Sequence, residues 1–167
     1  KGKSRNFGHL KGVQIIEKLV KYSIKLQIPI LTFYTFSTEN WKRPRKEITF
    51  LFKLIKDYFD KEINNLVKND IKINILGNLK PLPKKIRQCL LKSMSNTKKS
   101  KKIIVNLAIN YGSRNEILNA NKTILKKKMR ITYKNFKKSL YTKNMPEPDL
   151  LIRTGGENRL SNFLLWQ

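Results

Sequence analysis

The chain has 167 residues, of which 40% are hydrophobic, and this is enough for one domain with a buried core. Its net charge of +26 attracts polyanions such as nucleic acid, anionic lipid or phosphorylated substrates. The single cysteine excludes a disulfide framework, and no apolar run is long enough to span a bilayer. The lysines are spread along the whole chain, and a drift of composition toward Lys, Asn and Ile would produce the same excess. The charge therefore does not define a function by itself.

The first half of the chain predicts a helix, a strand and a second helix. Apolar residues recur at helical spacing over residues 8–26, and the apolar run 30–36 predicts a buried strand. A polar loop follows, and Pro44 suits the first turn of a long helix over residues 44–69. This helix has a main apolar face and a second apolar row of Phe50, Leu54 and Tyr58. Two apolar rows make the helix apolar over most of its circumference and indicate packing against two neighbouring elements.

The second half continues the alternation of strands and helices. In chain order the pattern predicts a strand over 71–76, a helix over 83–94, a strand over 103–109, helices over 112–127 and 133–140, and a strand over 149–153. The crossovers have the length that parallel strands require, so we expect a single α/β domain with a mostly parallel central sheet flanked by helices. Cys89 lies in the apolar pattern of a helix and is expected to be a buried, unreactive thiol.

Polar segments follow three of the predicted strands, after Phe36, Ile109 and Ile152. Ligands in such sheets bind beyond the carboxyl ends of the strands, so these segments are expected to meet at one site. The last one has the glycine pair 155–156, two arginines, a glutamate and a serine. Glycine lets the backbone approach a ligand closely, and arginine binds phosphate oxygens with two hydrogen bonds. A charged surface turn is the alternative, but apolar residues on both sides favour a phosphate site.

The final run, PDLLIRTGGENRLSNFLLWQ over residues 148–167, resembles the signature of the cis-prenyltransferases, the undecaprenyl diphosphate synthase and dehydrodolichyl diphosphate synthase family. Three further segments resemble this family in the same order: RNFGH at 5–9, FSTENWKRP at 36–44 and NYGSRNE at 110–116. The resemblance covers essentially the whole chain. It implies one catalytic domain over residues 1–167, without the family's first motif and C-terminal end. It also implies a hydrophobic tunnel, lined by the second row of the long helix and with Ile103 near its floor.

The activity that this resemblance implies is a Mg²⁺-dependent transferase reaction. The enzyme would condense isopentenyl diphosphate onto an allylic diphosphate, farnesyl diphosphate being the expected starter, to make a long-chain polyprenyl diphosphate for a glycan-carrier lipid. We expect a homodimer in the cytoplasm or an organelle, with peripheral membrane contact and no nucleic acid partner. The family's direct metal ligands fall outside this chain, so no residue is assigned to Mg²⁺.

The family's site residues transfer to this sequence by matching positions. Arg5 and His9 would hold the allylic diphosphate, whereas Arg153, Arg159 and Ser161 would hold isopentenyl diphosphate. A loop that closes over both substrates would contribute Ser37, Thr38, Glu39, Trp41 and Arg43, and Leu160 would also contact substrate. Glu157 would order the arginines or a metal-bound water. The family assigns Asn40 as the catalytic proton acceptor; because a neutral amide is a poor base, orienting a substrate or a diphosphate oxygen is the role we expect.

Two other functions are consistent with parts of the sequence. A basic nucleic-acid-binding domain would account for the charge, but the basic residues lack accompanying stacking motifs or a zinc pattern. A non-catalytic subunit of a two-component prenyltransferase is the second alternative. Such subunits tend to have degenerate substrate loops, whereas this chain keeps Ser37, Asn40, Arg43 and the Arg153 group, which favours a catalytic subunit.

Overall fold

The computed structural model describes the chain from Arg5 to Gln167, and its side chains from Phe7 onward. The elements, in order, are α1 (Arg5–Lys25), β1 (Ile30–Ser37), η1 (Thr38–Lys42), α2 (Arg45–Lys68), β2 (Ile71–Leu76), α3 (Lys84–Asn96), β3 (Ile103–Tyr111), α4 (Ser113–Lys126) and α5 (Tyr133–Lys137). The helices and strands predicted up to residue 140 are confirmed, with ends shifted by a few residues. The loop predicted after β1 is the 3-10 helix η1, and α5 is shorter than predicted.

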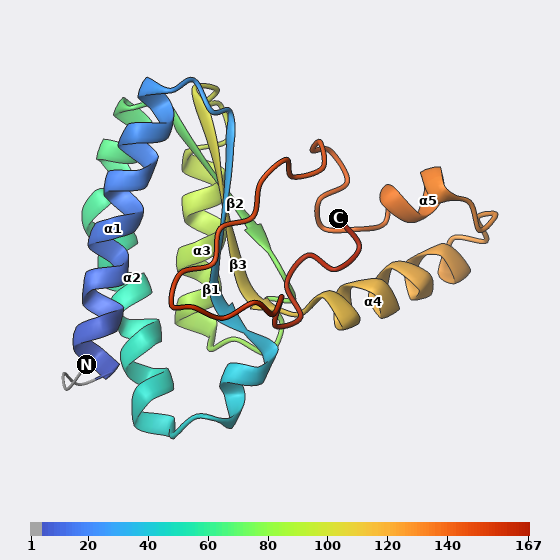
Figure 1. Cartoon of the computed structure of the whole chain (residues 1–167), viewed down its shortest axis with the longest axis horizontal. Helices are drawn as coiled ribbons and strands as arrows, with labels where there is room; N and C mark the ends of the chain where they lie inside the picture. The colour runs from blue at the N-terminus through green and yellow to red at the C-terminus, as the bar shows by residue number, and fades with distance from the viewer. Residues whose placement is uncertain (1–4) are drawn as a thin grey trace.

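The three strands form a parallel sheet in the order β1-β3-β2, so the expected parallel architecture is confirmed. β3 is the central strand, and its residues from Val105 to Tyr111 are all buried. A central parallel strand is covered on each side, and β3 accordingly has hydrophobic residues on both of its faces. All three carboxyl ends point to the same edge of the sheet, next to η1 and the start of α4 (Figure 1).

Helices α1, α2 and α3 cover one face of the sheet (Figure 1). The main core lies here, and α2 contacts α1, α3 and β2. The predicted main face of α2 is buried at Ile48, Leu51, Phe59 and Leu66. Phe50, Leu54 and Tyr58 are half-buried, in agreement with packing against more than one neighbour. Ile103 is fully buried in this core. The hydrophobic tunnel stays a prediction.

The second face of the sheet is covered by irregular chain. Tyr34, Leu76, Ala108 and Tyr111 pack here against partly buried side chains of the C-terminal segment, which are Tyr141, Met145, Phe163 and Leu164. A row of polar side chains also crosses this face. The Asn106 amide donates to Thr32 Oγ1 at 3.1 Å, and its Oδ1 accepts from Asn74 Nδ2 at 2.9 Å. The three strands are therefore linked by side chains as well as by their backbones.

The strand predicted over residues 149–153 is wrong. The segment is irregular and lies on the surface, with Leu150 76% and Ile152 78% exposed. The sheet has three strands, none of which pairs with this segment, and a run of apolar residues becomes a strand only where another strand supplies hydrogen bonds. The expectation that a third strand brings the arginine segment to the site is therefore also wrong. Among the described residues, no helix is long and apolar enough to cross a membrane.

Candidate functional site: two arginine groups beyond the strand ends

The predicted substrate loop begins at the end of β1 and folds as η1. The side-chain oxygen of Asn40 accepts a hydrogen bond from the Ser37 backbone N–H at 3.0 Å, and its backbone carbonyl accepts from Arg43 N–H at 3.0 Å. Polar side chains that bond back to a nearby N–H stabilise the start of such a turn. Asn40 is thus held in position by its own loop, and its amide nitrogen is the group that remains to meet a ligand.

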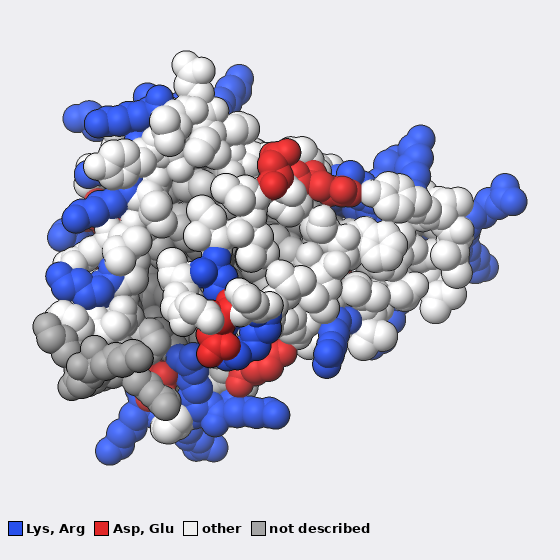
Figure 2. Space-filling model, viewed as in Figure 1, with Lys and Arg blue, Asp and Glu red and all other residues white. Residues whose placement is uncertain are grey.

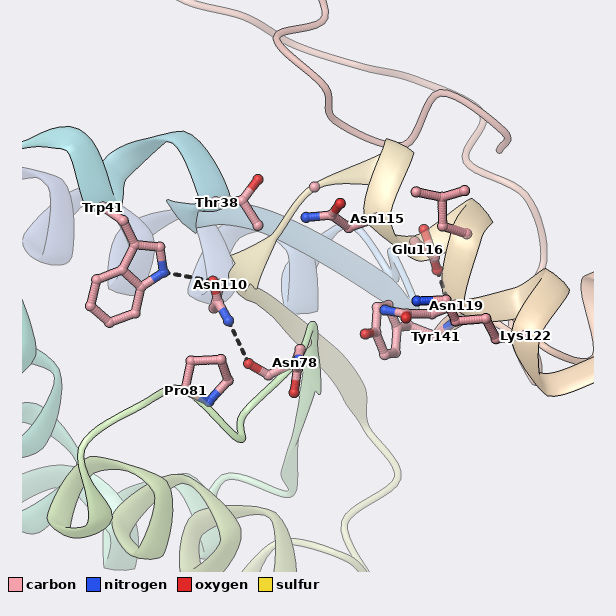
Figure 3. Close-up of a pocket in the computed structure, with 12 residues that line it drawn as sticks. Thr38, Trp41, Asn78, Pro81, Asn110, Asn115, Glu116, Asn119, Lys122 and Tyr141 are labelled. Atoms are coloured by element: carbon pink, nitrogen blue, oxygen red, sulfur yellow. Dashed lines mark hydrogen bonds between the residues drawn. The ribbon is translucent and has the colours of Figure 1, made fainter. Parts of the chain in front are cut away.

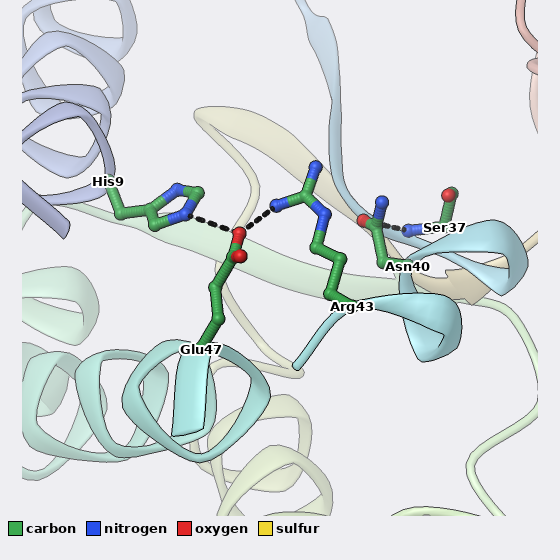
Figure 4. Close-up of polar contacts among 5 residues, drawn as sticks. All are labelled: His9, Ser37, Asn40, Arg43 and Glu47. Carbon is green, nitrogen blue, oxygen red and sulfur yellow. Dashed lines mark hydrogen bonds and ion pairs between the residues drawn. The ribbon is translucent and has the colours of Figure 1, made fainter. Parts of the chain in front are cut away.

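A cation–carboxylate cluster joins this loop to α1. Arg43 Nη1 donates to Glu47 Oε1 at 2.7 Å, and His9 Nε2 lies 3.4 Å from the same oxygen (Figure 4). His9, Arg43, Glu47 and Gly8 line a cavity of about 450 Å³. Only 9% of the Glu47 side chain is exposed, compared with 35% of Arg43 and 24% of His9. Arg43 and His9 therefore line the cavity together with the carboxylate that contacts both of them. Arg5, also predicted here, has a side chain outside the described residues.

Trp41 ties the loop to the ends of β2 and β3. Its indole N–H donates to Asn110 Oδ1 at 2.8 Å, and Asn110 Nδ2 donates to the Asn78 carbonyl at 2.6 Å (Figure 3). Glycine is needed beside this link, because Gly77 has φ of 134° and a Cβ there would lie 2.1 Å from the Ile109 carbonyl oxygen. These three segments, together with α4 and Tyr141, line an open cavity of about 570 Å³. Of the predicted site residues, only Thr38 and Trp41 line it.

Asn162 connects its own segment to two other segments that resemble the family, the loop after β1 and the start of α4. Its Nδ2 donates to Glu39 Oε1 at 2.7 Å, while its Oδ1 accepts from the Arg114 N–H at 2.8 Å and its carbonyl from the Ser113 N–H at 2.8 Å. Burial raises the pKa of Glu39, but hydrogen bonds from Asn162, from a backbone N–H and from the Ser37 and Thr38 hydroxyls outweigh it and leave this pKa below its usual value. Glu39 is therefore an anchor for the loop and stays ionised near neutral pH.

The arginine segment forms its own hydrogen-bonded turn. Arg153 Nη1 donates to Ser161 Oγ at 2.8 Å and to the Arg159 carbonyl at 2.5 Å, and Arg159 pairs with Glu157. The Tyr34 hydroxyl of β1 donates to the Ser161 carbonyl at 3.2 Å, which fixes the turn against the sheet. Burial raises the pKa of Tyr34 to about 12, so this donor keeps its proton at neutral pH. Arg153, Arg159 and Leu160 are exposed, so the turn presents its cations to solvent.

The structure thus places the predicted residues in two groups. His9, Ser37, Asn40, Trp41 and Arg43 lie around η1, and the Arg153 turn is linked to them through Asn162 and Tyr34. Sequence reasoning missed Glu47, Asn110 and Asn162. Arg43 and Glu47 are four positions apart, but Arg43 precedes α2, so the spacing rule for a helix did not indicate their contact. Asn162 lies inside a quoted motif, but nothing local to it indicated Glu39 as its partner.

The described site residues do not include a cluster of side chains that could hold a metal ion without other ligands. Over the described side chains, no group of three or more His, Cys, Asp or Glu residues lies close enough to hold a metal ion. Glu47 and Glu157 are each paired with an arginine, and Glu39 is bonded to an amide. Each of these three carboxylates is therefore already bonded to a side chain of this protein.

The parallel sheet defines an α/β protein, and its cationic and amide side chains lie beyond the strand ends, where sheets of this kind bind ligands. A family model described as putative undecaprenyl diphosphate synthase matches residues 1–167. An isoprenyl transferase of Clostridium tetani is 45% identical over 170 residues, covering 98% of this chain and 67% of the relative. The chain belongs to the undecaprenyl diphosphate synthase family of prenyltransferases, which extend isoprenoid chains with new cis double bonds.

Two solved structures have the same fold. A probable undecaprenyl diphosphate synthase from Campylobacter jejuni has 36% identity and a TM-score of 0.85, covering 99% of this chain and 76% of the other. The lavandulyl diphosphate synthase of Lavandula x intermedia, solved in complex with dimethylallyl diphosphate, has 30% identity and a TM-score of 0.93, covering 99% and 75%. The predicted family and fold class are confirmed.

Proposed function

We propose that this protein condenses isopentenyl diphosphate onto an allylic diphosphate, farnesyl diphosphate being the expected starter, to make a long-chain polyprenyl diphosphate that serves as a glycan-carrier lipid. The observation that supports this most is the link between two arginine groups, the His9–Glu47–Arg43 cluster and the Arg153 turn, through the loop and Asn162. Two diphosphates bound side by side need two cationic groups, and guanidinium forks suit their oxygens.

The reaction breaks the allylic C–O bond, forms a new C–C bond to isopentenyl diphosphate and releases diphosphate and a proton. Donors that are already aimed at the departing anion stabilise it more in the transition state than in the bound substrate. In this proposal Arg43 and His9 hold the allylic diphosphate, with Arg5 beside them. Arg153, Arg159 and Ser161 hold isopentenyl diphosphate, and Glu157 orders Arg159. The buried Glu47 keeps Arg43 in place without reorganisation during the reaction.

The loop has a second role in this proposal. Ser37, Thr38, Glu39, Trp41 and the neighbouring Leu160 would form the cover that keeps water from the reacting carbon. Asn40 would direct its free amide nitrogen to a substrate oxygen, since its own oxygen is already bonded. We expect the activity to need Mg²⁺ held by residues other than those described, and a homodimer in the cytoplasm or an organelle that contacts membranes peripherally.

The test is a product analysis with purified protein, labelled isopentenyl diphosphate, farnesyl diphosphate and Mg²⁺. A Mg²⁺-dependent ladder of extracted lipids that is lost in Arg153→Ala is the expected result, with Arg130→Ala as a control at an exposed arginine. Lost turnover in a protein that still binds diphosphate would favour a subunit that needs a partner. Neither turnover nor diphosphate binding, in folded protein, would contradict the proposal and favour a polyanion-binding domain.

A further inference from the structure

The outer face of α1 has a row of large apolar side chains that nothing in the described structure covers. Ile15, Leu19, Tyr22 and Leu26, called here the apolar stripe, are 54%, 45%, 62% and 70% exposed. Leu26 directly follows the last residue of α1, and its N–H donates to the Tyr22 carbonyl at 2.9 Å, which continues the helical turn. At 100° per residue they fall within an arc of about 60°. The buried face of the same helix, with Val20 and Ser23, borders the stripe on the side of Leu19 and packs toward the core. An uncovered stripe of this size on one helix indicates an interaction surface.

Lysines border this stripe along one side. Lys11, Lys18 and Lys25, called here the lysine row, are all exposed and repeat every seven residues, so they share one line on the helix within about 60° of the stripe. Lys25 Nζ lies 5.8 Å from the centre of the Tyr22 ring, which places a charge directly beside the stripe. Figure 2 shows basic groups separated by uncharged ones along the edge of the molecule where α1 and α2 lie in Figure 1.

We propose that the apolar stripe and the lysine row of α1 dock this protein on an anionic lipid bilayer. The helix would lie in the plane of the interface, with the stripe at the boundary between headgroups and acyl chains and the lysines at lipid phosphates. Helices of this composition bind membranes through buried apolar area together with attraction to anionic lipid. The net charge of +26 acts in the same direction.

The charges favour a bilayer over the other occupants of such a face. A second copy of this chain would bring one lysine row near another, and Glu17, the only acidic residue between Phe7 and Lys25, lies about 170° from the middle of the stripe. Nucleic acid would use the lysines but would leave Ile15, Leu19 and Leu26 without an apolar partner. Only a surface that is both anionic and apolar matches the stripe and the row together.

The position of the stripe connects it to the site. His9, near the start of α1, belongs to the site, whereas the stripe begins farther along the same helix. Docking would therefore hold the site close to the bilayer that receives a lipid product. This inference rests on the proposed function in one respect, because it assigns the membrane contact expected there to a particular surface.

The experiment is co-sedimentation of the purified protein with vesicles at physiological salt, comparing phosphatidylcholine alone with phosphatidylcholine containing phosphatidylglycerol. Leu19→Gln with Leu26→Gln tests the stripe, and Leu91→Gln with Leu125→Gln is the matched control, because these leucines are 51% and 70% exposed on α3 and α4. Lys18→Gln with Lys25→Gln tests the row against Lys127→Gln with Lys128→Gln. All these side chains are exposed, so the variants are expected to fold.

We expect binding that requires phosphatidylglycerol and falls about tenfold in the stripe variant and by roughly tenfold or more in the row variant, with both controls unchanged. Prenyl transfer measured without vesicles should be the same in stripe variant and wild type, which separates this inference from the proposed function. Equal losses in the controls would overturn it, as would binding that ignores the stripe. A dimer that dissociates in the stripe variant, with no vesicle binding, would assign the face to a second copy instead.

Discussion

Asn162 Nδ2 donates a hydrogen bond to Glu39 Oε1 at 2.7 Å across 123 residues of sequence. Glu39 lies in the loop after β1, and the Asn162 side chain also accepts from Arg114 at the start of α4. One amide thus holds together three segments that a motif search identifies separately. Because both ends of the amide are used, its loss cannot be compensated by one neighbour alone.

Asn162→Gly should lower the free energy of unfolding by about 1–3 kcal/mol, because the carboxylate of Glu39 and the Arg114 N–H both lose a partner. Glycine is the suitable replacement, since Asn162 has φ of 62° and alanine would add backbone strain. Chemical denaturation measures the change. Lys128→Gly is the control, because Lys128 has φ of 50° and an exposed side chain. If Asn162→Gly and Lys128→Gly changed the free energy of unfolding equally, the effect would come from the glycine backbone and not from the loss of the Asn162 side-chain amide.

Glu47→Gln should reduce kcat/KM for the allylic substrate about tenfold while leaving the thermal midpoint nearly unchanged. Glutamine keeps the shape of the side chain but removes the charge that fixes Arg43, so the guanidinium becomes less well oriented. Steady-state kinetics with the allylic diphosphate varied would measure this effect. Glu62→Gln, at a half-buried glutamate on the same helix, provides the comparison. Unchanged kinetics in Glu47→Gln would argue against an orienting role.

Gly112→Ala should destabilise the protein by about 1–3 kcal/mol, because a Cβ at this buried position would lie 2.5 Å from Thr38 Oγ1 and 2.7 Å from Asn162 Nδ2. The methyl group would push the loop away from the start of α4, so activity should fall as well. Gly12→Ala is the counterpart, since no atom lies within 4 Å of its Cβ and it is inside α1. Thermal unfolding should show a gain of about 0.5–1 kcal/mol for this variant.

The Cys89 thiol should react slowly with a thiol reagent in native protein. Burial raises the pKa of Cys89, and the charge of Asp60 raises it further, so less thiolate is present at a given pH than in the unfolded chain. The rate should increase as pH approaches the raised pKa. By linkage, the stability that this group contributes is present below the unfolded pKa and lost as pH rises through the folded one. Because the chain has one cysteine, the signal has one source, and equal native and unfolded rates would contradict the prediction.

The spacing of apolar residues predicted most of the fold, because it reflects which face of each helix or strand is buried. The main face of α2, from Ile48 to Leu66, and the strand over residues 71–76 were both confirmed. The prediction for residues 149–153 was wrong for a physical reason. An apolar composition is compatible with a strand, but pairing depends on a neighbouring strand elsewhere in the chain. The predicted Cys89 environment was partly right, since the thiol is half-buried.

The site was predictable where residues act within one segment and less so where they act across segments. Arg153 and Ser161 lie eight positions apart and do meet, at 2.8 Å. The partners of Trp41 and Glu39 come from 69 and 123 positions away, which no local pattern encodes. Asn110 has φ of 48°, a conformation that asparagine tolerates, and this explains the residue type without indicating its contact to Trp41.

The row of polar side chains Thr32, Asn106 and Asn74 favours one alignment of the strands over the alternatives. These residues are direct partners in the pairing of β1 with β3 and of β2 with β3. A slip of one strand by one residue would turn its polar side chain to the opposite face, where the apolar core offers no hydrogen bond. Misaligned sheets would thus bury unsatisfied amides at a cost of about 1–3 kcal/mol each. The correct alignment brings Trp41 and Asn110 within reach of each other, so polar residues in mid-sheet protect the geometry of a site at its edge.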